Sequence, residues 1–218
     1  LEKDVYLDKN NKKVVVGKIE KMSKSKKNVV DPSSIIEMYG ADTARWFMLS
    51  DSPPERDLEW TDTGIAGSYK FINKVWDLSN QVVSLDDNIS NINTNNDLEE
   101  LVNSSILEVT KNIEDFHFNK GVANIYKLIN GIGKNLAENT ASKKSLLLSI
   151  KNLSLLLQPF VPHLSEELWS LLGSQDLSIN QNWPKPEGEF KIKSHNVAIQ
   201  INGKIKTLLS LTFTPEKE

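Results

Sequence analysis

The residues best suited to chemistry in this sequence are lysines and serines crowded into one short stretch. Residues 21–27 read KMSKSKK and contain four lysines and two serines. An ammonium group on a flexible stem can follow a moving phosphate, and a serine hydroxyl adds a further hydrogen-bond donor. Such a loop could stabilise charge that develops on a departing pyrophosphate, an effect worth about 2.7–4 kcal/mol for one well-placed donor. The stretch therefore predicts a phosphate-binding loop.

Charge along the chain favours an anionic partner for the same segment. The 218 residues carry a net charge of -3, but residues 1–30 hold nine lysines and four acidic residues, a balance of +5. The remaining residues therefore sum to -8. A basic end of this kind suggests contact with an anion, most commonly phosphate, although charge alone also allows a solvated lysine-rich loop.

Other catalytic or metal-binding patterns are missing from the sequence. It has no cysteine, no P-loop, no GxGxxG, GxSxG or HExxH motif, and its three histidines do not stand at metal-ligand spacing. We therefore expect no metal site, and structural roles for His117 and His163. No apolar run is long enough to span a membrane, which together with the lack of cysteine fits a cytoplasmic protein.

The residues around the loop predict small elements that would position it. Residues 1–20 contain two β-branched segments separated by turn residues, which indicates a hairpin. Asp31 is expected to cap a short helix that begins at Pro32 and ends at Gly40, so that the N–H groups at the helix start face the loop. A second helix follows directly.

From Thr61 onward the helical period dominates. Four long amphipathic segments joined by polar loops, with a short fifth one behind them, predict an antiparallel bundle. In the first of these helices the expected inward stripe consists of Ile65, Tyr69, Ile72, Trp76 and Val83, widened by Phe71, Val75 and Val82. Asn119 is expected to cap the third.

The end of the chain changes to a period of two. "NVAIQINGKIK" alternates apolar and polar residues around Asn202-Gly203, which predicts a hairpin with a two-residue turn. One hairpin cannot bury a core, so we expect it to begin a small α/β domain. The predicted fold is therefore mainly α: a connector with a hairpin and short helices in residues 1–60, a helix bundle in 61–190, and the start of the last domain in 191–218.

The KMSKS string and its flanks resemble class I aminoacyl-tRNA synthetases. KMSKS looks like the signature loop of that class, and "KMSKSKKNVVDPSSIIEMYGADTARWFML" is similar to the segment that follows the loop in the leucine, isoleucine, valine and methionine enzymes. "SDSPPERDLEWTDTGIAGSYKFINKVWDL" resembles the leucyl branch in particular. "FNKGVANIYKLIN", "LLLQPFVPHLSEELW" and "VAIQINGKIK" resemble later leucyl segments in the same order, so the resemblance runs from about Val15 to Lys206.

The resemblance implies roles for individual residues. Lys24 and Lys21 would be catalytic and would contact ATP, and Met22, Ser23 and Ser25 would shape the ATP-binding loop. Candidates for tRNA backbone contacts are Lys26, Lys27 and Arg45, although the first two could also act only as screening charges. Arg45 could alternatively pair with Asp42, three residues earlier on the same helix.

The resemblance also implies an activity and partners. The family is an ATP- and Mg²⁺-dependent ligase that attaches leucine to tRNA(Leu), and the bundle would be its helical anticodon-binding domain. The closing hairpin would begin a domain that touches the tRNA elbow. Because the sequence lacks a H-I-G-H motif, a parallel-sheet nucleotide fold and an editing domain, we expect a fragment that is inactive alone, binds tRNA weakly and binds no cofactor itself. The sequence leaves the oligomeric state open, and a monomer is expected.

Three alternatives remain open at this point. The chain could belong to the valine or isoleucine enzyme, although "PPERDLEW" and "INGKIK" argue against it. It could be a stand-alone helical RNA-binding module, in which case the phosphate-binding loop would be idle. It could also be a structural scaffold, which would leave the basic first 30 residues unexplained.

Overall fold

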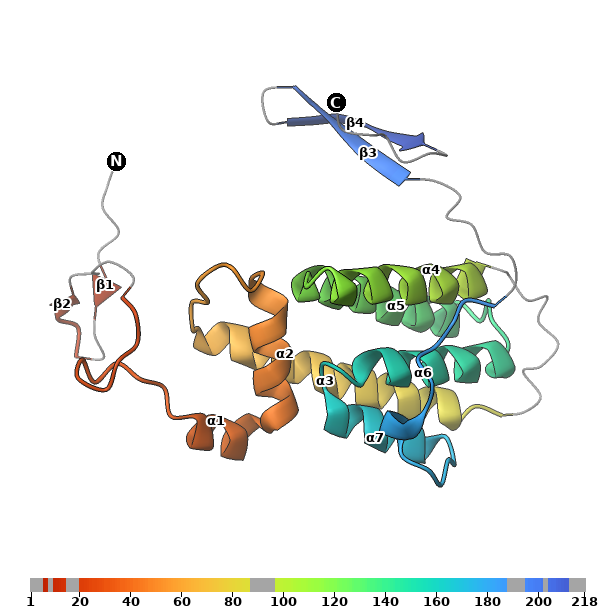
Figure 1. Cartoon of the computed structure of the whole chain (residues 1–218), viewed down its shortest axis with the longest axis horizontal. Coiled ribbons are helices and arrows are strands. Elements are labelled where there is room, and N and C mark those ends of the chain that lie inside the picture. Colours follow the sequence, from red (N-terminus) through yellow and green to blue (C-terminus); the bar gives the residue numbers. More distant parts are fainter. Residues whose placement is uncertain are drawn as a thin grey trace.

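The computed structural model describes residues 6–7, 10–14, 20–86, 97–187, 195–201 and 204–211. Within them a bundle of helices forms the main body, and one two-stranded sheet lies toward each end of the chain (Figure 1). The mainly α fold predicted from the sequence is therefore confirmed.

The first elements match the prediction closely. Strands β1 (Tyr6–Leu7) and β2 (Lys13–Val14) pair antiparallel, which confirms the hairpin for the described residues. Helix α1 (Pro32–Tyr39) begins after Asp31 and is followed at once by α2 (Ala41–Asp51). Gly40 separates the two helices with a φ of 83°, a backbone conformation that glycine adopts without strain.

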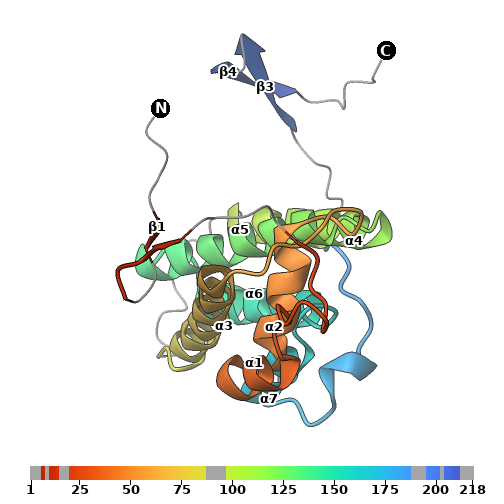
Figure 2. The same cartoon turned by 90° about the vertical axis from the view of Figure 1, so that its left-hand side faces the viewer.

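Five helices form the bundle, and consecutive helices run in opposite directions (Figure 1). Their bounds are α3 (Asp62–Val83), α4 (Asp97–Glu114), α5 (Phe118–Ala137), α6 (Lys143–Leu157) and α7 (Pro162–Leu171). Figure 2, turned by 90°, shows α2 standing against the bundle, where it packs on α3, α5 and α7. A short 3₁₀ helix, η2 (Ser178–Asn180), lies beside α6 and α7.

The core is a continuous apolar cluster to which every bundle helix contributes. Trp46 of α2 is fully buried in it and stacks on Phe71 of α3, with ring centroids 4.4 Å apart. The Trp46 indole N–H donates to the hydroxyl of Tyr126 at 3.3 Å. Stacked aromatic rings of this kind add to the free energy gained by burial, so α2 is joined firmly to the bundle.

The predicted inward face of α3 is partly wrong. Ile65 is buried as expected, but Tyr69 is 43% exposed and Trp76 is only half-buried. Phe71, Val75 and Val82 are buried as expected. The buried face also includes Ser68 and Ser79, whose hydroxyls donate to the carbonyls four residues earlier. A serine whose hydroxyl is hydrogen-bonded to a backbone carbonyl can occupy a core position. The buried face of α3 is therefore rotated relative to the stripe of apolar residues.

The predicted cap of α5 is also wrong. The helix begins at Phe118 with His117 as its N-cap residue, so Asn119 lies inside the first turn. The Asn119 side-chain oxygen is buried and has no hydrogen-bond partner in the described part of the chain.

The final strands confirm the second hairpin. β3 (His195–Ile201) pairs antiparallel with β4 (Lys204–Leu211), with an irregularity between Ile199 and Gln200. Ile201 pairs with Lys204, which leaves two residues for the turn. These two, Asn202 and Gly203, lie outside the described residues.

Candidate phosphate-binding loop and helical RNA-binding domain

The segment 20–28, called the lysine loop below, is closed by Asn28. The backbone N–H of Ser23 donates to the Asn28 side-chain oxygen at 2.8 Å, and the Asn28 side-chain amide donates to the carbonyl of Lys21 at 3.5 Å. The N–H groups of Lys26 and Lys27 donate to the carbonyls of Ser23 and Lys24, each at 3.2 Å. One amide side chain and two turns therefore hold the loop in shape.

Sequence reasoning assigned no role to Asn28. The residue type alone indicated a possible structural role for Asn28, because asparagine combines a donor and an acceptor on one short side chain and is common where a chain turns. The position of this asparagine, five residues after Ser23, could have indicated a contact across the loop.

The ammonium groups of the loop differ in what they contact. Lys26 Nζ lies 2.8 Å from a carboxylate oxygen of Glu20, and both side chains are more than half exposed. In the described part of the chain, Lys21, Lys24 and Lys27 are exposed and their ammonium groups have no protein partner. An anion could therefore bind these three ammonium groups without competing with a protein carboxylate.

The serines of the loop brace its backbone. The Ser23 hydroxyl lies 3.2 Å from the Ser25 hydroxyl and accepts from the N–H of Lys26 at 3.3 Å. Met22 is 42% exposed on the same loop. The structure thus places all five residues of the KMSKS string on one exposed turn, with Ser23 as its half-buried centre.

The start of α1 offers less to an anion than the sequence suggested. The Asp31 side chain accepts from the N–H of Ser33 at 3.0 Å, and its carbonyl accepts from the hydroxyl of Ser34 at 2.8 Å. A carboxylate already occupies this helix start. Positive charge at the site therefore comes from the lysines.

Arg45 and Asp42 do not pair with each other; both reach the corner between α6 and α7. Arg45 donates to the carbonyls of Pro159 and Phe160 at 2.8 and 3.0 Å, which lie just past the end of α6. The predicted pair is therefore wrong, because carbonyls left unpaired at a helix end are better placed for the guanidinium. A tRNA contact by Arg45 stays a prediction.

Glu166 fastens the segment that follows the bundle. Its carboxylate accepts from the N–H and hydroxyl of Ser178 at 2.7 and 2.8 Å and from the N–H of Ile179 at 3.1 Å. Burial alone would raise the pKa of Glu166, but these hydrogen bonds outweigh it and hold the pKa below the ordinary 4.5. Sequence reasoning did not find this contact, because the partners lie in a loop of unremarkable composition.

Two further contacts hold the same segment. The indole N–H of Trp183 donates to the Thr110 hydroxyl at 2.7 Å, and the side chain of Asn103 hydrogen-bonds both the N–H and the carbonyl of Glu187. Residues 174–187 are thus attached to α4 and α7 at several points. Trp183 thereby fixes its loop to α4.

Neither a metal centre nor a membrane span is found in the described ranges. They hold no group of three or more His, Asp or Glu side chains that could bind a metal ion, and none of their helices is long and apolar enough to cross a membrane.

Comparison with known families defines the class of protein. Residues 95–216 match the family described as the anticodon-binding domain of tRNA ligase, and residues 12–61 match tRNA synthetases class I (I, L, M and V). The chain belongs to the anticodon-binding domain family of tRNA ligases, with a class I synthetase segment in front. The domain boundaries at residues 60 and 190 stay predictions.

The similar proteins are leucine–tRNA ligases. The enzyme of Zymomonas mobilis is 41% identical over 218 residues, which are 100% of this chain and 25% of that protein. The enzyme of Orientia tsutsugamushi is 43% identical over 214 residues, 94% of this chain and 24% of that protein. The chain therefore spans about a quarter of the length of the curated relatives it matches, and its resemblance to the leucyl branch is confirmed.

A solved structure shows the same fold. LeuRS of Agrobacterium radiobacter K84, crystallised as the ternary complex LeuRS-tRNA-LeuAMS, superposes with a TM-score of 0.71 at 27% sequence identity. The match covers 89% of this chain and 26% of that LeuRS.

Proposed function

We propose that this chain works within a leucine–tRNA ligase, which activates leucine with ATP and Mg²⁺ and transfers it to tRNA(Leu) in the cytoplasm. In that enzyme the chain would supply the lysine loop and a helical domain that binds tRNA. The observation that carries the proposal is the exposed, unpartnered Lys21 and Lys24 on a closed loop, in a chain 41% identical over its length to a leucine–tRNA ligase.

The loop fits the activation step of this reaction. A leucine carboxylate oxygen attacks the α-phosphorus of ATP, the bond to the β-phosphate oxygen breaks, and pyrophosphate leaves with the negative charge. Lys24 and Lys21 would stabilise that charge as it develops, and the Asn28 contact would limit the conformations of the loop. A compact ammonium group suits a phosphate that moves during the reaction.

The tRNA would lie along the helices. Of the three candidate contacts, Lys27 is favoured, because its ammonium group has no partner in the described residues. Lys26 already pairs with Glu20, and Arg45 already binds two carbonyls. We propose that the ligase acts as a monomer.

The first test replaces Lys24 by alanine in a full-length ligase that carries this segment. We expect leucine-dependent ATP–pyrophosphate exchange to fall about tenfold or more, with little change in the KM for ATP, because the ammonium acts mainly in the transition state. Lys26→Ala is the matched control, since that ammonium pairs with Glu20, and should change exchange little. Normal exchange by the Lys24 variant would refute the proposed role of the loop.

A further inference from the structure

The bundle has a groove whose charged lining residues are all lysines. It lies where α3 ends and α6 begins, beside the end of α7, and has a volume of about 530 Å³. Lys143, Lys144 and Lys151 of α6 line it, above a floor of valine and leucine side chains. We call this feature the lysine groove.

No acidic residue is among the described residues that line the lysine groove. Residues 139–165 contain three lysines and no Asp or Glu, although the chain beyond residue 30 carries a net charge of -8. The described hollow between α3 and α5 also has two lysines, but Asp77 lines it as well. The hollow between α4 and α6 has one lysine and two glutamates. The lysine groove therefore concentrates positive potential on an otherwise acidic bundle.

The lysines of the groove are held in different ways. Lys143 donates to the carbonyl of Leu85 just beyond α3, so it also serves to neutralise that helix end. Lys151 Nζ lies 5.5 Å from the ring centroid of Trp169, where the aromatic face attracts a cation. Lys144 is exposed. A lysine held over a ring loses less conformational freedom when it binds an anion.

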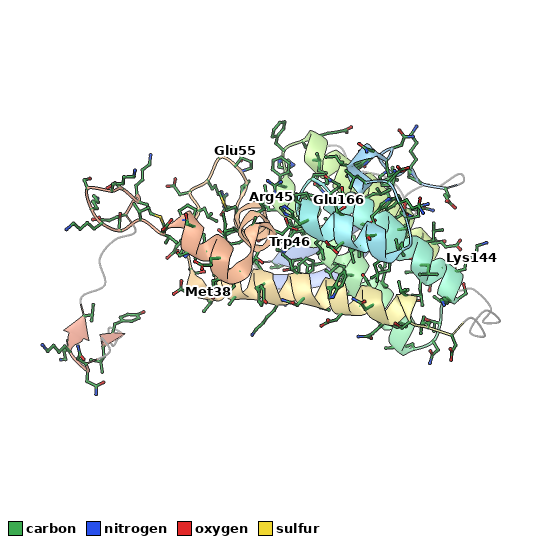
Figure 3. The ribbon with its side chains drawn as sticks, turned by 90° about the horizontal axis from the view of Figure 1, so that it is seen from below. Met38, Arg45, Trp46, Glu55, Lys144 and Glu166 are labelled. Carbon is green, nitrogen blue, oxygen red and sulfur yellow. The ribbon has the colours of Figure 1, made fainter. Side chains whose placement is uncertain are left out.

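The lysine groove and the lysine loop lie at opposite ends of the molecule. Figure 3 labels Lys144 at the end away from α1 and from the loop that precedes it. Helix α3, with 22 residues, runs between these ends and is about 33 Å long. A single nucleotide cannot bridge such a distance, whereas a structured polyanion such as a folded RNA can.

We propose that the lysine groove binds backbone phosphates of the tRNA and is a second anchoring point at the end of the bundle away from the lysine loop. This inference rests on the proposed function, because it assumes the same RNA partner. Backbone phosphates fit lysines better than bases do, since an ammonium group acts as a point charge without directional readout.

The test is a double charge reversal, Lys144→Glu with Lys151→Glu, in the 218-residue chain. Fluorescence anisotropy with a tRNA(Leu) transcript over a series of salt concentrations gives the Kd and its salt dependence. We expect affinity at low salt to fall about tenfold or more and the log–log salt slope to become shallower by about two. The matched control, Lys120→Glu with Lys127→Glu, reverses two exposed charges of α5 outside the groove.

Each outcome decides the proposal. A smaller loss in the α5 control, together with full binding by Lys144→Arg with Lys151→Arg, supports it. Equal losses of tRNA affinity in the groove variant and in the α5 control would show an effect of net charge alone and would overturn the groove proposal. Unchanged tRNA affinity of the groove variant would also overturn the groove proposal, and circular dichroism checks that the variant is folded. That result would not contradict tRNA binding by other parts of the chain.

A different measurement tests the proposed function independently of the groove proposal. In the full-length ligase the groove variant should keep normal ATP–pyrophosphate exchange, whereas Lys24→Ala should lose it. If the unaltered 218-residue chain binds no tRNA at any salt concentration, both the groove and the tRNA-binding role of the bundle are wrong.

Discussion

At the scale of single residues, Asp42 shows how one buried carboxylate joins two elements. Its side chain is almost fully buried on α2; one oxygen lies 2.9 Å from Nδ1 of His163, and the other accepts from the N–H of Leu164 at 2.7 Å. Helix α7 has Val161 at its N-cap position and no side-chain cap of its own. Asp42 therefore caps α7 from a helix more than 100 residues earlier.

Replacing Asp42 by alanine should destabilise the bundle by about 1–3 kcal/mol, because the buried N–H of Leu164 loses its acceptor. His163→Ala is the control: its side chain is 77% exposed, so its loss should cost about 0.5 kcal/mol or less. Urea unfolding followed by circular dichroism measures both. Equal effects of the two variants would mean that the histidine contact, and not the helix cap, carries the stabilisation.

The pH dependence of stability should reveal Glu166. Its pKa in the folded chain is held below the ordinary value, so the ionised form stabilises the fold above the unfolded-state pKa, and this contribution is lost as pH falls through the folded pKa. Glu166→Gln should therefore be less stable than the unaltered chain at neutral pH, and the difference should shrink in acid. Urea unfolding at a series of pH values measures it; a constant difference at every pH would contradict the role of ionisation.

The chemistry of single residues was more predictable than their contacts. The charge and exposure of Lys21 and Lys24 could be predicted from the sequence, because both follow from residue type and position in a loop. The partners of Asp42 and Arg45 were not, since each contacts residues 114 to 122 positions away. A local i, i+3 rule cannot anticipate a stronger acceptor that only the tertiary fold brings near.

At the scale of elements, the side chain of Leu101 on α4 packs closely over Gly131 of α5. A Cβ built at Gly131 would lie 2.0 Å from a methyl carbon of Leu101 on α4, whereas at Gly133, two residues later on the same helix, it would meet Leu78 only at 3.9 Å. A methyl group at the first position therefore requires the Leu101 side chain to shift, whereas the second position accepts one without a shift.

Gly133→Ala should stabilise the chain by up to about 1 kcal/mol, since alanine is the better helix former. Gly131→Ala gains the same propensity but must displace Leu101, so it should be less stable than Gly133→Ala by about 1–3 kcal/mol. Thermal unfolding of the two variants makes the comparison. Equal stability would show that Leu101 changes rotamer freely and that α4 and α5 do not need glycine here.

The periodicity of apolar residues predicted the helices of the bundle, but it did not predict which residues of each helix are buried. The four long apolar repeats of residues 61–157 predicted the helices, because a period of 3.6 over many turns has few alternative explanations. The rotation of α3 was missed because Ser68 and Ser79 occupy core positions, and an apolar pattern treats serine as outward-facing. Only the hydrogen bonds of their hydroxyls show that they belong inside.

At the scale of the whole molecule, the basic end of the chain is distinct from the part that forms the folded core. Strands β1 and β2 contact no other described element, and within the described residues the buried apolar core extends from Trp46 to Trp169. The described residues of this basic end, 6–7, 10–14 and 20–30, therefore lie outside the core that stabilises the helices. Folding and attraction of an anion should be separable by deletion.

Removal of residues 1–30 should leave the thermal unfolding midpoint of the helices unchanged, because none of the described residues that it removes belongs to the buried core. The same deletion removes a net charge of +5, so tRNA affinity at low salt should fall about tenfold or more and its salt dependence should become shallower. Glutamine at Lys21, Lys24, Lys26 and Lys27 in the intact chain tests whether the lysine loop accounts for that loss. Unchanged affinity after the deletion would contradict an RNA contact by the basic end, and a lower midpoint would show that this end supports the bundle after all.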